Sequence, residues 1–264
     1  MEKVDISDLE DLLNQFNSLA NCFVFRGQAN ADWSMTSSLE RLIGPDWDAT
    51  KANKLEEFSL AEFKSRFHLY DTENRHPESK LSWLAAMQHY GVPTRLIDFT
   101  TSPYVALYFA LESFSPTHRS DFSVFAIDYS ATMKRSFERL RNEVPDFHET
   151  HDSLRGQQDK VYQNIVDLQA RDVIWISEPS VLNRRLDKQA GCFLLSGNRS
   201  RRPTDVLTDD IYGGVTFTQY RIDAALYEIV FALLRKLNIN SRTLYGDLDG
   251  LGRSIRMELQ AYAC

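Results

Sequence analysis

Residues 88–112 read QHYGVPTRLIDFTTSPYVALYFALE, and this stretch decides the fold class. The apolar run at 96–99 predicts a short buried strand. Ser102 and Pro103 predict the start of a helix, because serine caps helix N-termini and proline fits the first helical position. Upstream, residues 79–90 have helical spacing, and Gly91 followed by Pro93 predicts the end of that helix. A strand therefore lies between two helices.

Other elements follow on both sides of this stretch. Helices are expected at 9–19, where Ser7 and Glu10 form a capping-box pattern, and at 50–70, 224–237 and 247–260. A short helix is expected to begin at Pro179 and to stop at Gly191. The aromatic and β-branched runs predict strands at 22–26, 122–128, 173–177, 192–196 and 216–222. Residues 197–213 are expected to be a polar loop.

This order lacks the strict alternation of strands and helices of a parallel doubly wound sheet, so it indicates an α+β fold. We expect small antiparallel or mixed β-sheets flanked by helices, with a helical N-terminal part. No linker is rich enough in Pro, Gly and Ser to divide the chain, so 1–264 is predicted to be one domain. Residues 130–170 are predicted to be a polar insertion, either helical or a mobile cover.

The composition is that of a globular protein, with 43% hydrophobic and 25% charged residues. The net charge of −7 argues against coating nucleic acid through bulk charge. The N-terminus lacks the basic flank and apolar run of a secretion signal, and no segment is apolar enough to span a bilayer. We therefore expect a cytoplasmic protein without membrane contact.

The three cysteines lack metal-type spacing, and His148 and His151 have no convincing third ligand, so no metal is expected. The Walker glycine loop, the dinucleotide-binding Gly-x-Gly-x-x-Gly and the Gly-x-Ser-x-Gly elbow are all absent from the sequence.

The first candidate site is Phe25-Arg26-Gly27-Gln28. An arginine at the end of a buried strand offers a planar fork for phosphate, and the following glycine lets backbone groups approach a ligand. The alternative is an arginine that leaves a strand into solvent with glycine in the turn, and the local pattern favours this alternative.

The second candidate is the polar part of 88–103. His89 can act as a base or orient a substrate, and Tyr90 offers a ring for stacking. Arg95 and Asp98 can contact a ligand, and the alternative is that they pair with each other. Helix capping explains Ser102, but it leaves the hydroxyls of Thr100 and Thr101 beside these charged groups unexplained.

The third candidate lies at 185–194, where Gln189 precedes a strand and can present its amide to a sugar hydroxyl. The alternative is an ordinary helix end. Arg199, Arg201 and Arg202 follow in a basic stretch that could steer a phosphorylated ligand, an acceptor protein or nucleic acid, or could form a solvated loop.

Together these segments resemble the FRG domain family, named for its Phe-Arg-Gly motif. The resemblance rests on four segments, which are FRGQ (25–28), QHYGVPTRLIDFTTSPYVALYFA (88–110), Arg185 with QAGCF (189–193), and TLYGDLDGLGRSI (243–255). The segment 88–110 is the specific one.

The motif order also resembles, more distantly, that of the ADP-ribosyltransferases. In that superfamily an Arg or His on a first strand meets NAD, a Ser-Thr-Ser or Tyr strand precedes a helix with Ala and Phe-Ala, and a third strand carries a catalytic Glu. Arg26, Thr100-Thr101-Ser102 and Gln189 would occupy these places, with Gln standing where Glu is expected.

This second resemblance implies an ADP-ribosyltransferase-like fold, with NAD as substrate and no metal. It implies an ADP-ribosyltransferase or NAD glycohydrolase, such as a toxin or an antiviral defence effector. The implied catalytic residues are Arg26, His89, Thr100 and Gln189. The implied NAD contacts are Arg26, Gly27, Gln28, Tyr90, Arg95, Asp98, Thr101, Ser102, Tyr104 and Tyr108.

Because Gln189 cannot supply negative charge, Asp98, Glu178 or Glu228 are candidates for the missing carboxylate. Two alternatives stay open. One is a non-catalytic module for nucleotide or nucleic-acid recognition that kept the pocket. The other is a nucleic-acid-directed enzyme that uses the basic stretch.

Overall fold

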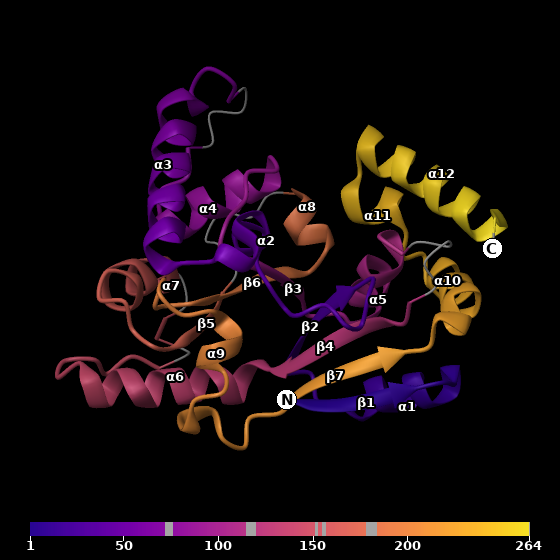
Figure 1. Ribbon diagram of the computed structural model, residues 1–264, viewed down its shortest axis with the longest axis horizontal. Helices are drawn as coiled ribbons and strands as arrows, with labels where there is room; N and C mark the ends of the chain where they lie inside the picture. The colour runs from indigo at the N-terminus through magenta and orange to yellow at the C-terminus, as the bar shows by residue number, and fades with distance from the viewer. Residues whose placement is uncertain (72–75, 115–119, 151–152, 155–156, 178–183, 264) are drawn as a thin grey trace.

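The α+β prediction is confirmed by a computed structural model, which describes residues 1–71, 76–114, 120–150, 153–154, 157–177 and 184–263. A mixed seven-stranded sheet runs through the molecule and is flanked by helices (Figure 1). The strands are β1 (Glu2–Ile6), β2 (Phe23–Gln28), β3 (Ile97–Thr100), β4 (Phe122–Asp128), β5 (Ile174–Ser177), β6 (Gly191–Ser196) and β7 (Phe217–Ile222).

The sheet has the strand order β1-β7-β4-β2-β3-β6-β5. Strands β1 and β7 are parallel, and the other neighbours are antiparallel. Strand β2 pairs with β4 along its whole length, whereas it meets β3 only at Phe25 and Thr100. The ladder between β2 and β3 is therefore one pair long, and this is the weakest joint of the sheet.

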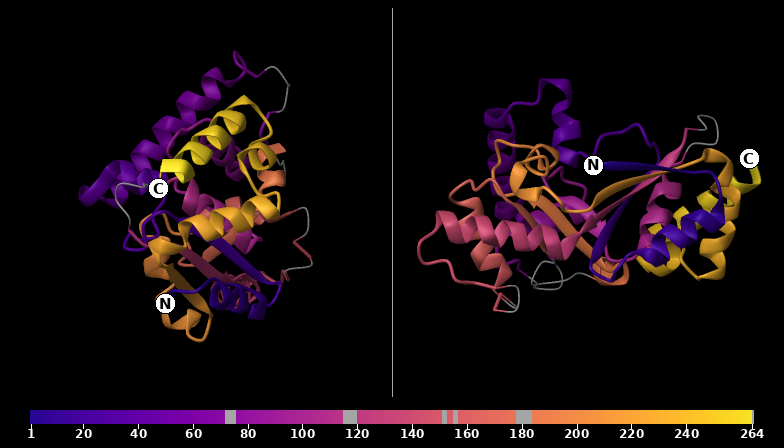
Figure 2. Two further views of the ribbon diagram at one scale, coloured as in Figure 1. Left: turned by 90° about the vertical axis from the view of Figure 1, so that its right-hand side faces the viewer. Right: turned by 90° about the horizontal axis from the view of Figure 1, so that it is seen from below.

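The longer helices cover both faces of the sheet (Figures 1 and 2). They are α1 (Leu9–Ser18), α3 (Ala49–Phe67), α4 (Lys80–His89), α5 (Pro103–Glu112), α6 (Tyr129–Glu143), α10 (Tyr227–Lys236) and α12 (Leu248–Ala263). The shorter helical segments are α2 (Ser38–Ile43), η1 (Gly44–Asp46), α7 (Gln158–Val161), the π-helical η2 (Tyr162–Asp167), α8 (Arg184–Lys188), α9 (Pro203–Val206), η3 (Asp210–Tyr212), η4 (Ala224–Leu226) and α11 (Ser241–Tyr245).

Two hydrophobic clusters lie on opposite faces of strand β2, because successive side chains of a strand point to opposite faces. Val24 belongs to a cluster that includes Leu84 of α4 and Met133 of α6. Phe25 belongs to the other cluster, with residues of α1, α5 and α10 such as Phe16. Helices α4 and α6 therefore cover one face of β2, and α1, α5 and α10 cover the other.

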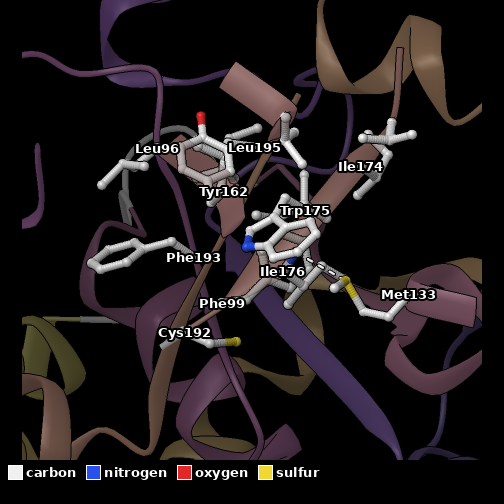
Figure 3. Close-up of a cluster of buried hydrophobic side chains, with 14 of the residues drawn as sticks. Leu96, Phe99, Met133, Tyr162, Ile174, Trp175, Ile176, Cys192, Phe193 and Leu195 are labelled. Atoms are coloured by element: carbon white, nitrogen blue, oxygen red, sulfur yellow. Dashed lines mark hydrogen bonds between the residues drawn. The ribbon is translucent and has the colours of Figure 1, made fainter. Parts of the chain in front are cut away.

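The predicted insertion at 130–170 contributes to the core. Helix α6 and segment η2 lie within it, and Met133 and Tyr162 pack around the fully buried Trp175 of β5 (Figure 3). The sulfur of Met133 accepts a hydrogen bond from the backbone N–H of Ile176 at 3.3 Å. The described residues of this part thus include the helical segments α6, α7 and η2 and the non-helical stretch 144–150, and they pack against the sheet.

The N-terminal prediction missed strand β1 and helix α2. Strand β1 is a five-residue edge strand in which only Ile6 is buried. Its local signal is therefore short, and pairing with β7 stabilises it. The capping box at Ser7 is wrong, because Asp8 caps α1 by accepting from the backbone N–H of Glu10 at 2.5 Å.

Gly91 and Gly191 were both predicted to end helices, and only Gly91 does so. Gly91 has a φ of +80° directly after α4, which confirms the predicted stop. Gly191 is not a helix stop but the first residue of β6, and Ala190 takes the positive φ of 44° instead. The predicted helix start at Pro179 falls outside the described residues, and α8 begins at Arg184. The predicted loop at 197–213 contains α9 and η3.

Candidate functional site

A cleft of about 330 Å³ opens beside the β2–β3 joint. It is lined by residues of β2, β3, α4, α5, α8, β6, α11 and α12, together with the turn that precedes β6. The candidate residues it brings together are Arg26, Gly27, His89, Asp98, Thr100 and Gln189. Three segments far apart in the sequence thus share one cavity.

Arg26 lies across the gap between the two strands. Its Nη1 donates to the backbone oxygen of Asp98 at 2.9 Å, and its Nε is buried without a hydrogen-bond partner. Burial lowers the pKa of Arg26, although the Asp98 carboxylate opposes this shift. That carboxylate accepts from Gln88 Nε2 at 2.6 Å. Among the described residues, no carboxylate forms an ion pair with Arg26, so its guanidinium is a cation available to a ligand.

Two further arginines form a second positive wall of the cleft. The guanidinium carbons of Arg185 and Arg253 lie 4.3 and 4.8 Å from the ring centroid of Tyr245. Arg253 is paired with Asp249 at 2.8 Å, whereas Arg185 has no carboxylate partner in the described part of the chain. Burial and the neighbouring Arg185 lower the pKa of His89.

Glu112, at the end of α5, is a buried carboxylate of the cleft that the sequence analysis missed. It accepts from the hydroxyls of Tyr108 at 2.9 Å and Tyr245 at 2.8 Å, and it lies 3.3 Å from Arg253 Nη1. Burial, together with this carboxylate, raises the pKa of both tyrosines. The available signal was a single acid at the end of the otherwise apolar YVALYFALE helix.

Thr100 and Gln189 contact each other at the back of the cleft. Thr100 Oγ1 donates to the backbone oxygen of Gln189 at 2.7 Å and accepts from the backbone N–H of Ser102 at 3.1 Å. Gln189 is buried, and its Nε2 donates to the backbone oxygen of Leu244 at 3.4 Å. Both side chains therefore also hold the fold together.

Gly27 lines the cleft, but its lack of a side chain serves the packing of α5. A Cβ atom built on Gly27 would lie 1.8 Å from the backbone oxygen of Ala106. The glycine is required because the helix and strand backbones approach so closely.

The structure places the remaining predicted contacts outside this cleft, namely Gln28, Tyr90, Arg95, Thr101, Ser102, Tyr104 and Tyr108. Ser102 caps α5 by accepting from Val105 N–H at 3.3 Å, as the structural interpretation expected. Tyr104 packs edge-on against Phe16, and Tyr90 is exposed beside the ring of Phe63.

Arg95 neither lines the cleft nor pairs with Asp98, which was the alternative considered for it. Arg95 is buried in a separate ionic cluster, 3.0 Å from Glu56 and 2.5 Å from Asp167. Lys80 lies 2.9 Å from the same Asp167 carboxylate. This cluster ties α3, α4 and η2 together, which gives Arg95 a structural role.

The basic stretch is neutralised within the fold. Arg199 lies 3.4 Å from Asp167, and Arg201 makes two 2.8 Å hydrogen bonds to Asp209. Arg202 lies 3.4 Å from Glu40 and over the ring of Trp47. These arginines therefore do not form the uncompensated positive patch that recruitment of nucleic acid would use.

Of the other candidate carboxylates, Glu228 is the described one, and it is not among the residues that line the cleft. Glu228 is exposed on α10, and Glu178 lies outside the described residues, as does His151. In the part of the chain that the structure describes, no cluster of His, Cys, Asp or Glu could hold a metal ion. None of its helices combines the length and apolarity needed to cross a bilayer.

The fold and the cleft thus define an α+β protein with an arginine-lined cavity at a sheet joint. Residues 21–119, from the start of β2 past α5, match the family model of the FRG domain. This match supports the resemblance to the FRG family over that part of the chain. No curated protein and no solved structure matches the chain. The comparisons therefore give the ADP-ribosyltransferase resemblance no support.

Proposed function

We propose that the cleft binds NAD and that the protein is an ADP-ribosyltransferase-like enzyme, which transfers ADP-ribose to an acceptor or to water. The observation that carries this proposal is the convergence of Arg26 and Arg185 on one cavity without carboxylate partners among the described residues. A bound phosphate would supply the anionic partner that both guanidinium groups lack among the described residues.

The volume and the polarity of the cleft suit one half of a dinucleotide. A volume of about 330 Å³ lies at the lower end of the roughly 300–1,000 Å³ range of ligand pockets. In this proposal the arginines bind the pyrophosphate, and the amides of Gln88 and Gln189 bind the ribose and the nicotinamide carboxamide.

The reaction breaks the bond between the ribose C1′ and the nicotinamide nitrogen. The electron pair leaves with nicotinamide, and an oxocarbenium-like ribose remains. The acceptor then forms a bond to C1′ and loses a proton, and His89, whose lowered pKa favours the neutral imidazole, is the proposed base. Glu112 supplies the negative charge that Gln189 lacks, acting on the developing cation from within the cleft.

The test is calorimetric titration of the protein with NAD, combined with chromatographic analysis of nicotinamide release. Arg185→Gln should weaken NAD binding at least tenfold. Arg235→Gln is the matched control, because Arg235 also lies over an aromatic ring, that of Phe231, but outside the cleft. Absence of NAD binding, or equal effects of the two substitutions, would contradict the proposal.

A non-catalytic recognition module is the second candidate. It is favoured by the donors that already surround the Glu112 carboxylate, namely Tyr108, Tyr245 and Arg253, since they reduce the charge available to a reaction. In that case NAD or a related nucleotide would bind and raise the melting temperature, while no nicotinamide is released.

A further inference from the structure

Helix α12 carries its large apolar side chains on its outer face. Leu248, Leu251, Ile255, Leu259 and Tyr262 are 85%, 42%, 52%, 64% and 85% exposed. The helix lies on the outside of the molecule, at the yellow end of the chain (Figures 1 and 2). A surface helix normally turns such a stripe toward the core, so the arrangement is reversed here.

Polar contacts fix this orientation from the inner side. Arg253 reaches the Glu112 carboxylate at 3.3 Å, and Arg256 Nη2 donates to the backbone oxygen of Glu112 at 3.0 Å. Met257 and Ser254 are buried on the same side. Because α12 is held by these groups, rotation of the helix to bury the stripe would break them.

The spacing of the stripe is symmetric about Ile255. Leu251 and Leu259 lie four residues to either side, and Leu248 and Tyr262 lie seven residues to either side. At 3.6 residues per turn the five side chains span an arc of roughly 80°. An antiparallel pair of such helices places Ile255 on its own copy, Leu251 on Leu259 and Leu248 on Tyr262.

From this symmetry we propose that the chain forms a two-fold dimer in which α12 packs antiparallel against α12 of a second copy. An interface of this type must be self-complementary, and a palindromic apolar stripe meets that requirement. This dimer proposal does not depend on which ligand the cleft binds. The dimer would also hold Arg253, a cleft residue, in position from outside.

A second exposed apolar surface, on α3, is the other place where α12 of a second copy could pack. Exposed aromatic residues of α3 and its surroundings, including Phe58, Tyr70 and Tyr90, line a groove of about 610 Å³. If α12 of one copy docked into this groove of another, the contact would be heterologous and would give rings or open chains instead of dimers.

Light scattering coupled to size-exclusion chromatography tests the dimer. The unsubstituted chain at tens of micromolar should have twice the chain mass, and Ile255→Glu should reduce it to one chain mass. Phe58→Glu is the matched control, 67% exposed on α3, and it should remain dimeric. Circular dichroism should show both variants folded. A monomeric parent chain, or a dimer that survives Ile255→Glu, would overturn the proposal.

Cysteine cross-linking tests the antiparallel register. In a Cys22→Ser, Cys264→Ser background, the double variant Leu248→Cys, Tyr262→Cys should form a disulfide-linked dimer under mild oxidation. Leu248→Cys alone should not, because its two copies would lie about 21 Å apart along the helices, well beyond disulfide reach. Cross-linking by Leu248→Cys alone would indicate parallel pairing and refute this register.

Discussion

At the scale of single residues, the arginines fall into two groups. Arg95 and Arg201 are paired with carboxylates and hold segments of the fold together. Arg26 and Arg185 line the cleft, and no carboxylate pairs with either in the described ranges. Both side chains of the second group are half-buried, and a phosphate in the cleft would give these arginines an anionic partner.

The close approach of α5 to β2 requires glycine at position 27. Gly27→Ala should lower the free energy of unfolding by about 3 kcal/mol or more, because the new methyl group would meet the backbone of α5, which cannot rotate away. Urea denaturation measures this loss. Gly252→Ala is the control, since nothing lies within 4 Å of its Cβ position, and it should be neutral or stabilise α12 by up to about 1 kcal/mol. Equal destabilisation by both changes would contradict this account.

At the scale of elements, the joint between β2 and β3 creates the cleft. The two strands share one pair, and α5 packs against β2 through Gly27 on one side of that joint. The end of β3 is tied to the turn before β6 by Thr100. The cleft opens here because β2 and β3 share only one ladder pair, and the Arg26 side chain bridges part of the remaining gap.

Thr100→Val tests this tie. The substitution removes the hydroxyl that joins Gln189 and Ser102 while keeping the shape, so it should cost about 1–3 kcal/mol of unfolding free energy. Thr101→Val is the matched control, because that side chain is exposed, and its effect should stay within about 0.5 kcal/mol. Urea denaturation of both variants decides the question, and a neutral Thr100→Val would show that the tie contributes nothing.

At the scale of the whole molecule, the ionic cluster of Glu56, Lys80, Arg95 and Asp167 joins segments that are distant in sequence. Burial acts to raise the pKa of Asp167, but Arg95 and Lys80 hold it below its ordinary value of 3.8. A carboxyl group with a lowered pKa stabilises the fold above its unfolded pKa, and this stability is lost as the pH falls through the folded value.

Asp167→Asn should therefore cost about 3 kcal/mol at neutral pH, because Arg95 and Lys80 lose a partner while Glu56 remains. The difference in unfolding free energy between Asp167→Asn and the unsubstituted chain should shrink as the pH falls below 3.8. Denaturation at a series of pH values measures it. Asp46→Asn, at an exposed position, is the control for loss of a surface charge, and its effect at neutral pH should stay within about 0.5 kcal/mol. A difference for Asp167→Asn that stays constant across the pH series would rule out this linkage.

The sequence by itself determined the elements with strong local signals. Helix α5 was predicted with its cap at Ser102, and α4 with its end at Gly91, because capping and a positive φ are properties of a few neighbouring residues. The α+β class followed from the order of these elements. The presence of Arg26, Thr100 and Gln189 in one cleft was also anticipated, through motif order and not through local pattern.

Only the tertiary structure decided the rest. Strand β1 exists through its pairing with β7, more than two hundred residues away. Glu112 became a cleft residue because Tyr245 and Arg253 close over it, and Arg95 left the predicted site because Glu56 and Asp167 attract it. Contacts between distant segments leave no periodic trace in the chain, since hydrogen bonds and ion pairs constrain distance in space and not separation in sequence.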